Sequence, residues 1–334
     1  MFDWKKIKKP IIALAPMADY TDSPFSLICK KFGADVIYRE MVSAEALVRG
    51  NEKTLKMAEF DKKERPIILQ IFGANPKTMA RAARILEEKF HPDGIDINMG
   101  CPARKIVGNF NGACLMKDPS QAAKIVEAVK SAVSCQVSVK TRTGWSGSDE
   151  ILKFAPILEK AGADAIAIHG RTKAMGYAGK ADWEIVGRVK EKLSIPVLLN
   201  GDIVNFESFK KAIDISGADG VLIGRGALGF PWIFRNIKNK SSSRTFADSH
   251  LAPRFAGRAK VSLLDKKDVA PSLAEIKKVL LEHAKLHLAH YGEKGIILFR
   301  KHAVSYFKGA PDAKNIRIKL AKINNLEELS QAFQ

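Results

Sequence analysis

Short apolar runs recur along the first two thirds of the chain, and amphipathic segments separate them. Eight such runs are rich in Ile, Val and Leu and are too short for helices: 11–17, 36–42, 67–73, 94–100, 136–142, 165–171, 196–202 and 220–226. Continuous apolar runs of this length are typical of strands buried on both faces of a parallel sheet. The intervening segments, such as 79–90 and 121–133, have helical periodicity and often end in glycine.

Eight alternations of strand and helix over about 230 residues predict an α/β fold, a (β/α)8 TIM barrel. The structural alternative is an open doubly wound sheet, which usually has fewer strands and a glycine-rich turn after its first strand. The turn here reads APMADYTDSP and contains no glycine. We therefore favour the closed barrel.

The pattern changes after the last apolar run. Residues 238–272 show no clear period and are predicted to form an irregular linker or insertion. Helical periodicity returns from residue 273 onward. We therefore predict a barrel at 1–237 and a small, all-helical C-terminal domain at 273–334.

Polar residues gather at the predicted C-terminal ends of the strands, where barrels carry out chemistry. They are Gln70, Asn98, Cys101, Lys140, Arg142, His169, Arg171, Asn200, Asp202 and Arg225. A polar side chain that faces a barrel interior has to be satisfied, so this ring indicates a ligand or a network of mutual hydrogen bonds. Because so many strands share the pattern, we favour a ligand.

The last two predicted strands end in NGDI and IGRG. Glycines at these positions let backbone N–H groups approach an anion, and Arg225 could bind a phosphate with two hydrogen bonds. Two tight turns without a ligand are the alternative. Together the motifs favour a ligand that carries a phosphate group.

Two side chains in this ring have more than one chemical interpretation. Lys140 on an interior strand is costly unless it pairs or reacts, and it could form a Schiff base or hold the negative charge of a cofactor. Cys101 could be a metal ligand, an inert buried thiol, or a proton donor or nucleophile. It lacks Cys or His partners at ligand spacing, and its place on a glycine-to-proline turn favours a role in catalysis.

Cysteine and histidine spacing gives no sign of a metal site. The four cysteines form no CxxC pair, which indicates free thiols in a reducing compartment and a cytoplasmic protein. His283, His287 and His290 share one predicted helix, but zinc needs further ligands. We interpret them as half-exposed helix residues and predict no metal.

The chain carries a net charge of +19, and residues 238–334 hold 19 Lys and Arg against 9 Asp and Glu. A dense positive charge favours a polyanionic partner, with nucleic acid first, although an unspecialised basic surface is the alternative. Arg300, Lys301 and Lys308 could share a helix face that contacts phosphates. No apolar run approaches the roughly 20 residues that span a bilayer, so we expect no membrane partner.

The order of the motifs resembles one family. APMADYTDSPF, LQIFG, DINMGCPARKIV, VKTRTGW, HGRTKAMGYAGKADW, LLNGDI and GVLIGRGALGFPWIF follow one another between about residues 8 and 237, and RKHAVSYFKG follows later. In these motifs the chain resembles the tRNA-dihydrouridine synthase family, and its bacterial B-type branch most of all. The resemblance implies an FMN-containing barrel that reduces a uridine of tRNA to 5,6-dihydrouridine, with NADPH as the electron donor.

The resemblance also implies roles for individual residues. The flavin would contact Pro16, Met17, Ala18, Gln70, Lys140, His169, Asn200, Gly201, Asp202, Gly224 and Arg225. Lys140 would then be an electrostatic partner of the reduced flavin rather than a Schiff base. Asn98 would touch the target base, and Cys101 would donate a proton to C5 after hydride reaches C6. Arg300 and Lys301 would contact the tRNA, from which one base has to be extracted.

Two features depart from the family pattern. Ala113 and Cys114 stand where the family more often has a serine-containing run of small residues, and Cys114 is not the catalytic candidate. The segment 238–272 is longer and more irregular than expected. The competing functions are a flavin oxidoreductase that acts on a free pyrimidine or an enone, and a non-catalytic RNA-binding barrel. We favour a monomer, although the sequence leaves the oligomeric state open.

Overall fold

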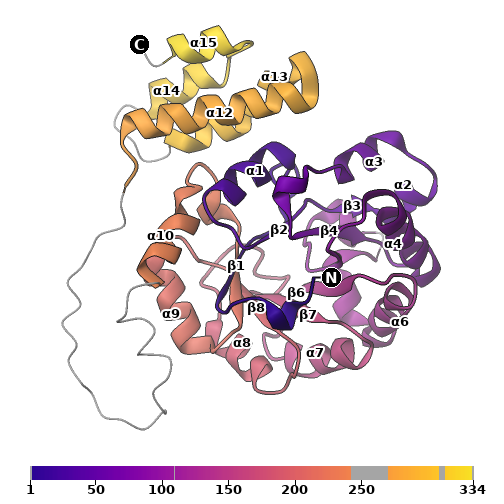
Figure 1. Ribbon diagram of the computed structural model, residues 1–334. Helices are drawn as coiled ribbons and strands as arrows, with labels where there is room; N and C mark the ends of the chain where they lie inside the picture. Colours follow the sequence, from indigo (N-terminus) through magenta and orange to yellow (C-terminus); the bar gives the residue numbers. More distant parts are fainter. Residues whose placement is uncertain (1, 109, 242–269, 308–312, 333–334) are drawn as a thin grey trace, which may run out of the picture.

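Eight parallel strands close into a barrel in the computed structural model, which describes residues 2–108, 110–241, 270–307 and 313–332 (Figure 1). The barrel strands are β1 (Ile11–Leu14), β2 (Val36–Tyr38), β4 (Ile67–Phe72), β5 (Gly94–Met99), β6 (Gln136–Arg142), β7 (Ala165–His169), β8 (Val197–Asn200) and β9 (Gly220–Ile223). β1 pairs with β9 and β2 pairs with β4, so the sheet closes on itself. Each predicted apolar run contains one of these eight barrel strands, which confirms the TIM barrel.

The second position in the barrel is shared by two short strands. β2 pairs with β4 at Ile67 and Ile68, and β3 (Val42–Ser43) pairs further along β4 at Ile71 and Phe72. The apolar run 36–42 is therefore interrupted rather than continuous.

Helices surround the barrel, as the alternating pattern predicts (Figure 1). They are α1 (Ser23–Lys31), α2 (Ala44–Val48), α3 (Glu52–Ala58), α4 (Pro76–Phe90), α5 (Arg104–Val107), α6 (Pro119–Lys130), α7 (Ile151–Lys160), α8 (Trp183–Lys190), α9 (Phe206–Ser216) and α10 (Trp232–Ser241). Short 3-10 turns accompany them: η1 (Trp4–Lys6), η2 (Lys62–Glu64), η3 (Gly112–Lys117) and η4 (Arg225–Ala227). Side-chain caps define where many of these helices begin, as with Asp22 for α1, since they satisfy N–H groups that have no partner inside the helix.

The period of two along each strand divides the buried side chains into two clusters. Ile95, Ile97 and similar residues face the helices. The second cluster fills the barrel and consists of Trp4, Ile11, Ala13, Ala15, Val36, Tyr38, Ile68, Ala165, Ala167, Leu198 and Leu222. Trp4 stacks on Tyr38 with ring centroids 6.0 Å apart. The apolar residues thus fill the end where the strands begin, and polar residues occupy the other end.

A helical region follows the barrel and packs beside α1 (Figure 1). It contains α12 (Leu273–Tyr291), η5 (Gly292–Lys294), α13 (Gly295–Ala303), η6 (Val304–Phe307), α14 (Ala313–Leu320) and α15 (Leu326–Gln331). An ion pair of 2.5 Å joins Lys31 of α1 to Glu282 of α12. The predicted C-terminal helices are confirmed.

Parts of the predicted boundary region lie outside the described residues. α10 continues to Ser241, so the first residues of the segment 238–272 are helical. Residues 242–269 and Lys308 lie outside the described part of the chain. Where the structure does describe the chain, no helix combines the length and the hydropathy needed to cross a bilayer.

The interpretation of the α12 histidines as half-exposed is wrong for two of them. His283 and His287 are fully buried, at 0% exposure each, because their face of the helix packs against α1 and α13. His290, one turn further, is half-buried.

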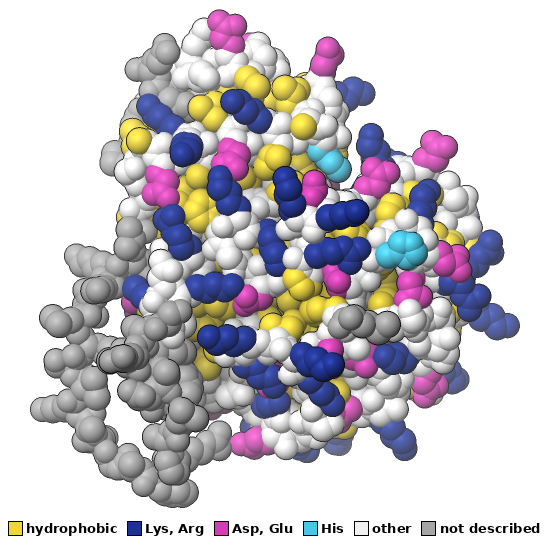
Figure 2. All heavy atoms as spheres, in the orientation of Figure 1, with side chains coloured by type: hydrophobic (Ala, Val, Ile, Leu, Met, Phe, Trp, Pro, Cys, Tyr) yellow, Lys and Arg dark blue, Asp and Glu magenta, His cyan; other side chains and the backbone are white. Residues whose placement is uncertain are grey.

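Basic side chains are spread over the molecule rather than gathered in one patch on the face shown in Figure 2. Lys and Arg cover both the barrel and the helical region there, with Asp and Glu between them. On this face, the basic side chains are therefore distributed over both the barrel and the helical region.

Candidate active site

Five adjacent strands each carry a polar side chain in their C-terminal half. Gln70, Asn98, Lys140, His169 and Asn200 come from β4, β5, β6, β7 and β8. The register pairs Asn98 with Lys140 and His169 with Asn200 across neighbouring strands. The structure therefore brings together the ring that the sequence pattern predicted.

A chain of hydrogen bonds leads from the barrel interior to the turn that carries Cys101. The Gln70 amide donates to the carboxylate of Asp96 at 2.7 Å and accepts from the Asn98 amide at 2.9 Å. The Asn98 side-chain oxygen then accepts from the backbone N–H groups of Gly100 (3.1 Å) and Cys101 (2.9 Å). Each amide is thus fixed in orientation by the one before it.

Asn98 uses its full hydrogen-bonding capacity inside the protein. Its oxygen accepts the two backbone bonds, and its N–H groups donate to Gln70 and to the sulfur of Met41, at 3.3 Å. The side chain is only 8% exposed. In this structure Asn98 builds the Cys101 turn, and its predicted contact with a target base stays a prediction.

Arg142 supports the same turn from the next strand. Its Nε donates to the Gly100 carbonyl at 2.8 Å, and a second guanidinium nitrogen donates to the carbonyls of Thr172 (3.0 Å) and Gly176 (2.8 Å). A Cβ on Gly100 would lie 3.1 Å from the Thr141 backbone, so the turn needs glycine to lie this close to β6. The free, half-exposed thiol of Cys101 is therefore held on a turn with two supports.

Lys140 is a half-buried cation whose ammonium reaches a side chain on β8, two strands away from its own strand β6. Its ammonium donates to the Asn200 oxygen at 3.0 Å, and the Asn200 amide donates to the Leu222 carbonyl at 2.8 Å. Burial, and after it the charge of Arg142, lower the pKa of Lys140 to about 8, although Asp96 and Cys101 act in the other direction. The side chain therefore stays largely charged at neutral pH.

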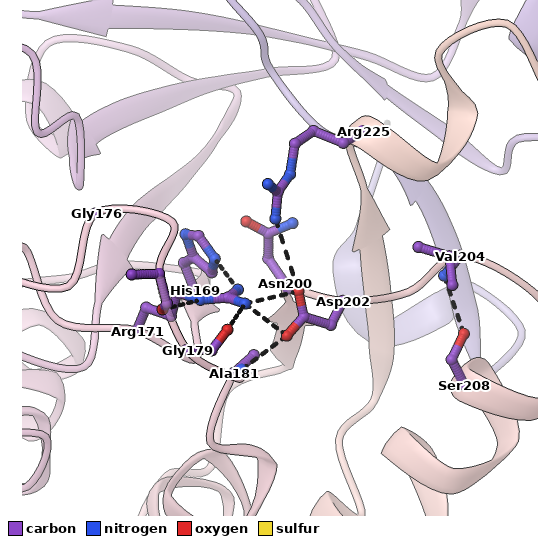
Figure 3. Close-up of polar contacts among 12 residues, drawn as sticks. His169, Arg171, Gly176, Gly179, Ala181, Asn200, Asp202, Val204, Ser208 and Arg225 are labelled. Carbon is purple, nitrogen blue, oxygen red and sulfur yellow. Dashed lines mark hydrogen bonds and ion pairs between the residues drawn. The ribbon is translucent and has the colours of Figure 1, made fainter. Parts of the chain in front are cut away.

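The ends of β7, β8 and β9 meet around Asp202 (Figure 3). Arg171 donates to both carboxylate oxygens of Asp202, at 2.9 and 2.7 Å, and Arg225 reaches one of them at 3.6 Å. Gly201 has φ +121°, which a residue with a side chain rarely adopts, so the NGDI turn requires glycine. Arg225 is 56% exposed and can turn toward a ligand.

The electrostatic field in the ring is strongly positive. Burial, together with four surrounding cations, lowers the pKa of His169 to about 2; the cations are Lys140, Arg142, Arg171 and Arg225. His169 is therefore a neutral imidazole. Only Asp202 and Asp96 oppose these cations within the ring just described, and burial raises the pKa of Asp96 to about 7. An anionic ligand fits this charge distribution.

The sequence carries a family match over nearly its whole length. A model of the family described as dihydrouridine synthase matches residues 13–334. The chain belongs to the dihydrouridine synthase family. A probable tRNA-dihydrouridine synthase of Rickettsia conorii is 39% identical over 312 residues, covering 92% of this chain and 87% of that protein. The tRNA-dihydrouridine synthase B of Pseudomonas putida is 38% identical over 320 residues, covering 95% and 87%.

Solved structures share the fold at much lower identity. Histamine dehydrogenase from Rhizobium sp. 4-9 superposes with a TM-score of 0.54 at 12% identity, over 69% of this chain and 46% of that one. A complex of 2-naphthoyl-CoA reductase gives the same TM-score and identity over 69% and 50%. This chain thus spans about half the length of those two proteins, and the likeness concerns the barrel fold alone.

The loop after β1 brings the remaining predicted residues to the same end of this dihydrouridine synthase barrel. The Met17 N–H donates to the Thr21 hydroxyl at 2.8 Å, which shapes the loop that also contains Pro16 and Ala18. A Cβ on Gly224 would lie 3.4 Å from the Met17 sulfur, so the loops after β1 and β9 are in contact. Their contact with a flavin stays a prediction.

The two predicted tRNA contacts on α13 differ in their surroundings. Arg300 donates to the carbonyls of Ile323 (2.8 Å) and Lys322 (3.3 Å) and to the Asn324 side chain (2.7 Å), so it orders the turn before α15. Lys301 instead reaches the barrel and lies 5.7 Å from the ring centre of Tyr20. Of the two, Lys301 is closer to the candidate site.

Two further site residues were not predicted from the sequence. Asp96 has no direct link to a ligand, but it lies two residues before Asn98, and the strand period could have placed it in the interior. Tyr177 lies in an irregular segment, 60% exposed, with Arg225 and Arg142 over its ring at 4.7 and 5.6 Å. No strand pattern reaches that segment.

Proposed function

We propose that this chain reduces uridine in tRNA to 5,6-dihydrouridine, with FMN as its bound cofactor and NADPH as the electron donor. The observation that carries the proposal is a half-exposed thiol, on a doubly supported turn, beside an inner ring with an excess of positive charge. The substrate is inferred from its relatives, which are named as tRNA-dihydrouridine synthases.

The residues at the site fit an anionic flavin. Lys140 would face the flavin ring from β6, where its half-buried ammonium donates to an amide oxygen, that of Asn200. The Gly201 and Gly224 turns, with Arg225, would hold the phosphate. The rest of the proposed contact set is Pro16, Met17, Ala18, Gln70, His169, Asn200 and Asp202. His169 can only act as a neutral partner, since its pKa is about 2.

When bound, reduced FMN supplies a hydride to C6 of the uracil ring. Cys101 then transfers its thiol proton to C5, so that a C–H bond forms and a thiolate remains. Arg142 and Lys140 are close enough to Cys101 for its charge to raise their pKa values. The thiolate is reprotonated from solvent, which completes the addition of two hydrogens.

The helical region is the proposed second contact for tRNA. Lys301 projects from α13 toward Tyr20, in the loop that follows β1. A phosphate contact there would position the tRNA without reading its sequence. A phosphate contact by Arg300 would compete with the three internal acceptors that its guanidinium already has.

The experiment is to purify the chain, record its visible spectrum, and incubate it with NADPH and tRNA transcribed in vitro. Mass analysis of the nucleosides is expected to show uridine that has gained two hydrogens. A colourless protein would contradict the proposal that the chain binds FMN. It would favour a non-catalytic RNA-binding barrel or a Schiff base at Lys140. A flavoprotein that reduces free pyrimidines or enones but leaves tRNA unchanged would contradict the proposal that tRNA is the substrate.

Cys101→Ala tests the proton donor. The variant is expected to retain flavin and its reduction by NADPH, and to lose most tRNA reduction, by about 10²–10⁴-fold for a missing general acid. Cys135→Ala is the matched control, because this buried thiol precedes β6 at the opposite end of the barrel. Equal tRNA reduction by both variants would show that Cys101 is not the acid.

A further inference from the structure

A cluster of buried ligand-type side chains lies where the helical region meets the barrel, away from the ring of polar strand ends. We call it the histidine cluster, and it consists of Asp22, His283, His287 and His302. One donor atom from each side chain lies within 4.8 Å of the others. All four side chains are at most 2% exposed.

Three separate elements contribute to the cluster. Asp22 is the N-cap of α1, in the barrel, and its Oδ1 accepts from the Phe25 N–H at 3.0 Å. His283 and His287 are four residues apart on α12, which puts them on the same helix face. His302 comes from α13. No single stretch of sequence therefore contains the set.

Most nitrogens of the cluster lack a hydrogen-bond partner within the described part of the chain. These are Nε2 of His283, both ring nitrogens of His287, and Nε2 of His302. Buried polar atoms are nearly always satisfied, and each exception calls for an explanation such as a missing ion. Among them, His287 Nε2 lies 3.5 Å from Asp22 Oδ2.

The surroundings orient the rings as those of metal ligands are oriented. His283 Nδ1 lies 3.1 Å from the buried Tyr306 hydroxyl, which leaves Nε2 free to face the cluster. The Tyr291 hydroxyl donates to Asp22 Oδ2 at 3.2 Å. Outer hydrogen bonds of this kind fix the tautomer and direction of a ligating side chain. Burial also lowers the pKa of all three histidines, so their rings are neutral and carry a free lone pair.

We propose that the histidine cluster binds one structural Zn²⁺ ion, which joins the helical region to the barrel. Three imidazoles and one carboxylate are a set that zinc accepts, and a closed, buried set of four is typical of structural rather than catalytic zinc. Calcium and magnesium prefer oxygen ligands, which excludes them here. In tetrahedral coordination the ligand atoms lie about 3.4 Å apart, so the widest separation has to close by about 1.4 Å at most.

No metal was predicted from the sequence, because α12 alone offers too few ligands. The two missing ligands are supplied by α13 and by α1, some 260 residues earlier in the chain, at Asp22. The zinc would hold α1 next to the loop that carries Met17 and Tyr20. The inference is independent of the proposed reaction, since it concerns how two parts of the chain are held together.

The first test measures metal in the full-length protein. Wild-type chain, produced with zinc in the medium and dialysed, is expected to contain one zinc per chain by elemental analysis. Its X-ray absorption spectrum is expected to show only nitrogen and oxygen ligands. Removing the metal with a chelator is expected to lower the thermal unfolding temperature, and added Zn²⁺ to restore it. A chain without stoichiometric zinc, a sulfur-containing ligand shell, or an unfolding temperature indifferent to zinc would overturn the proposal.

The second test uses variants. His287→Ala and His302→Ala are expected to bind zinc at least about tenfold more weakly than the wild type, while Tyr306→Phe loses affinity through misorientation of His283. His290→Ala is the matched control, because this half-buried histidine is on the same helix but outside the cluster. Equal zinc affinity in His287→Ala and His290→Ala would place the metal elsewhere. If the alanine variants fail to fold, the wild-type measurements still decide.

Discussion

Asp96→Asn is expected to change how the stability of the protein depends on pH. Asp96 is fully buried between Gln70 and Ser138, from which it accepts hydrogen bonds of 2.7 and 2.6 Å. An asparagine has the same size, accepts from Gln70 through its oxygen, and donates to the Ser138 hydroxyl, which can rotate toward Tyr38. The fold and the amide chain to Cys101 are therefore retained, while the ionisable group is removed.

The magnitude follows from the pKa of Asp96, which burial raises from 3.8 to about 7. Because the folded carboxyl holds its proton more tightly than the unfolded one, its contribution to stability is full below about pH 4 and is lost as the pH rises to about 7. The whole loss is about 4 kcal/mol, of which about 2.5 kcal/mol falls between pH 5 and pH 8. Lys140 contributes mainly above this window, because its pKa is lowered from 10.5 to about 8.

Urea unfolding at pH 5 and pH 8 measures the effect. Between pH 5 and pH 8 the wild type is expected to lose about 2.5 kcal/mol more of its unfolding free energy than Asp96→Asn loses. Ser138→Ala is the control, since it keeps the carboxyl and removes a hydrogen bond that lowers its pKa. The same difference in wild type and Asp96→Asn would refute a neutral buried carboxyl.

Two further variants test the cationic side of the ring. Lys140→Met is expected to weaken FMN binding by roughly 10- to 100-fold, the value of a charge-assisted hydrogen bond, measured by fluorescence titration; an unchanged dissociation constant would contradict the predicted contact. Arg142→Lys is expected to destabilise the fold by about 1–3 kcal/mol and to increase hydrogen exchange at Gly100 and Cys101, because an ammonium cannot bridge three carbonyls. Arg49→Lys, at a side chain 80% exposed, is the control for Arg142 and is expected to change neither quantity.

Strand periodicity allowed the barrel and much of its inner ring to be predicted. In a parallel strand buried on both faces, a polar residue at the C-terminal end is conspicuous, and Gln70, Asn98 and Lys140 were found that way. The contacts among them were beyond such reasoning. The Asn98 oxygen accepts hydrogen bonds from two backbone N–H groups of the Cys101 turn. This depends on where the turn places those two groups, which the spacing of residues in the sequence does not reveal.

The histidines of α12 show a different limit. Helical spacing correctly places His283 and His287 on one face, but the exposure of that face depends on what packs against it. Here α1 and α13 bury this face. Of these two helices, α1 is remote in sequence, and α13 follows α12 after a short turn. Long-range packing therefore converts an apparently ordinary polar helix face into a fully buried one.

The same physical circumstance connects the stability of the barrel with its proposed chemistry. Burial shifts the pKa values of Lys140, His169 and Asp96 in the direction that favours the uncharged side chain. Without a ligand, the site therefore disfavours the charged forms of these residues. The cations nevertheless outnumber the carboxylates there, so an anion that enters the ring gains attraction that water would otherwise screen. This excess of positive charge lowers the stability of the free protein and raises its affinity for an anionic cofactor. The same four cations help to keep the imidazole of His169 neutral.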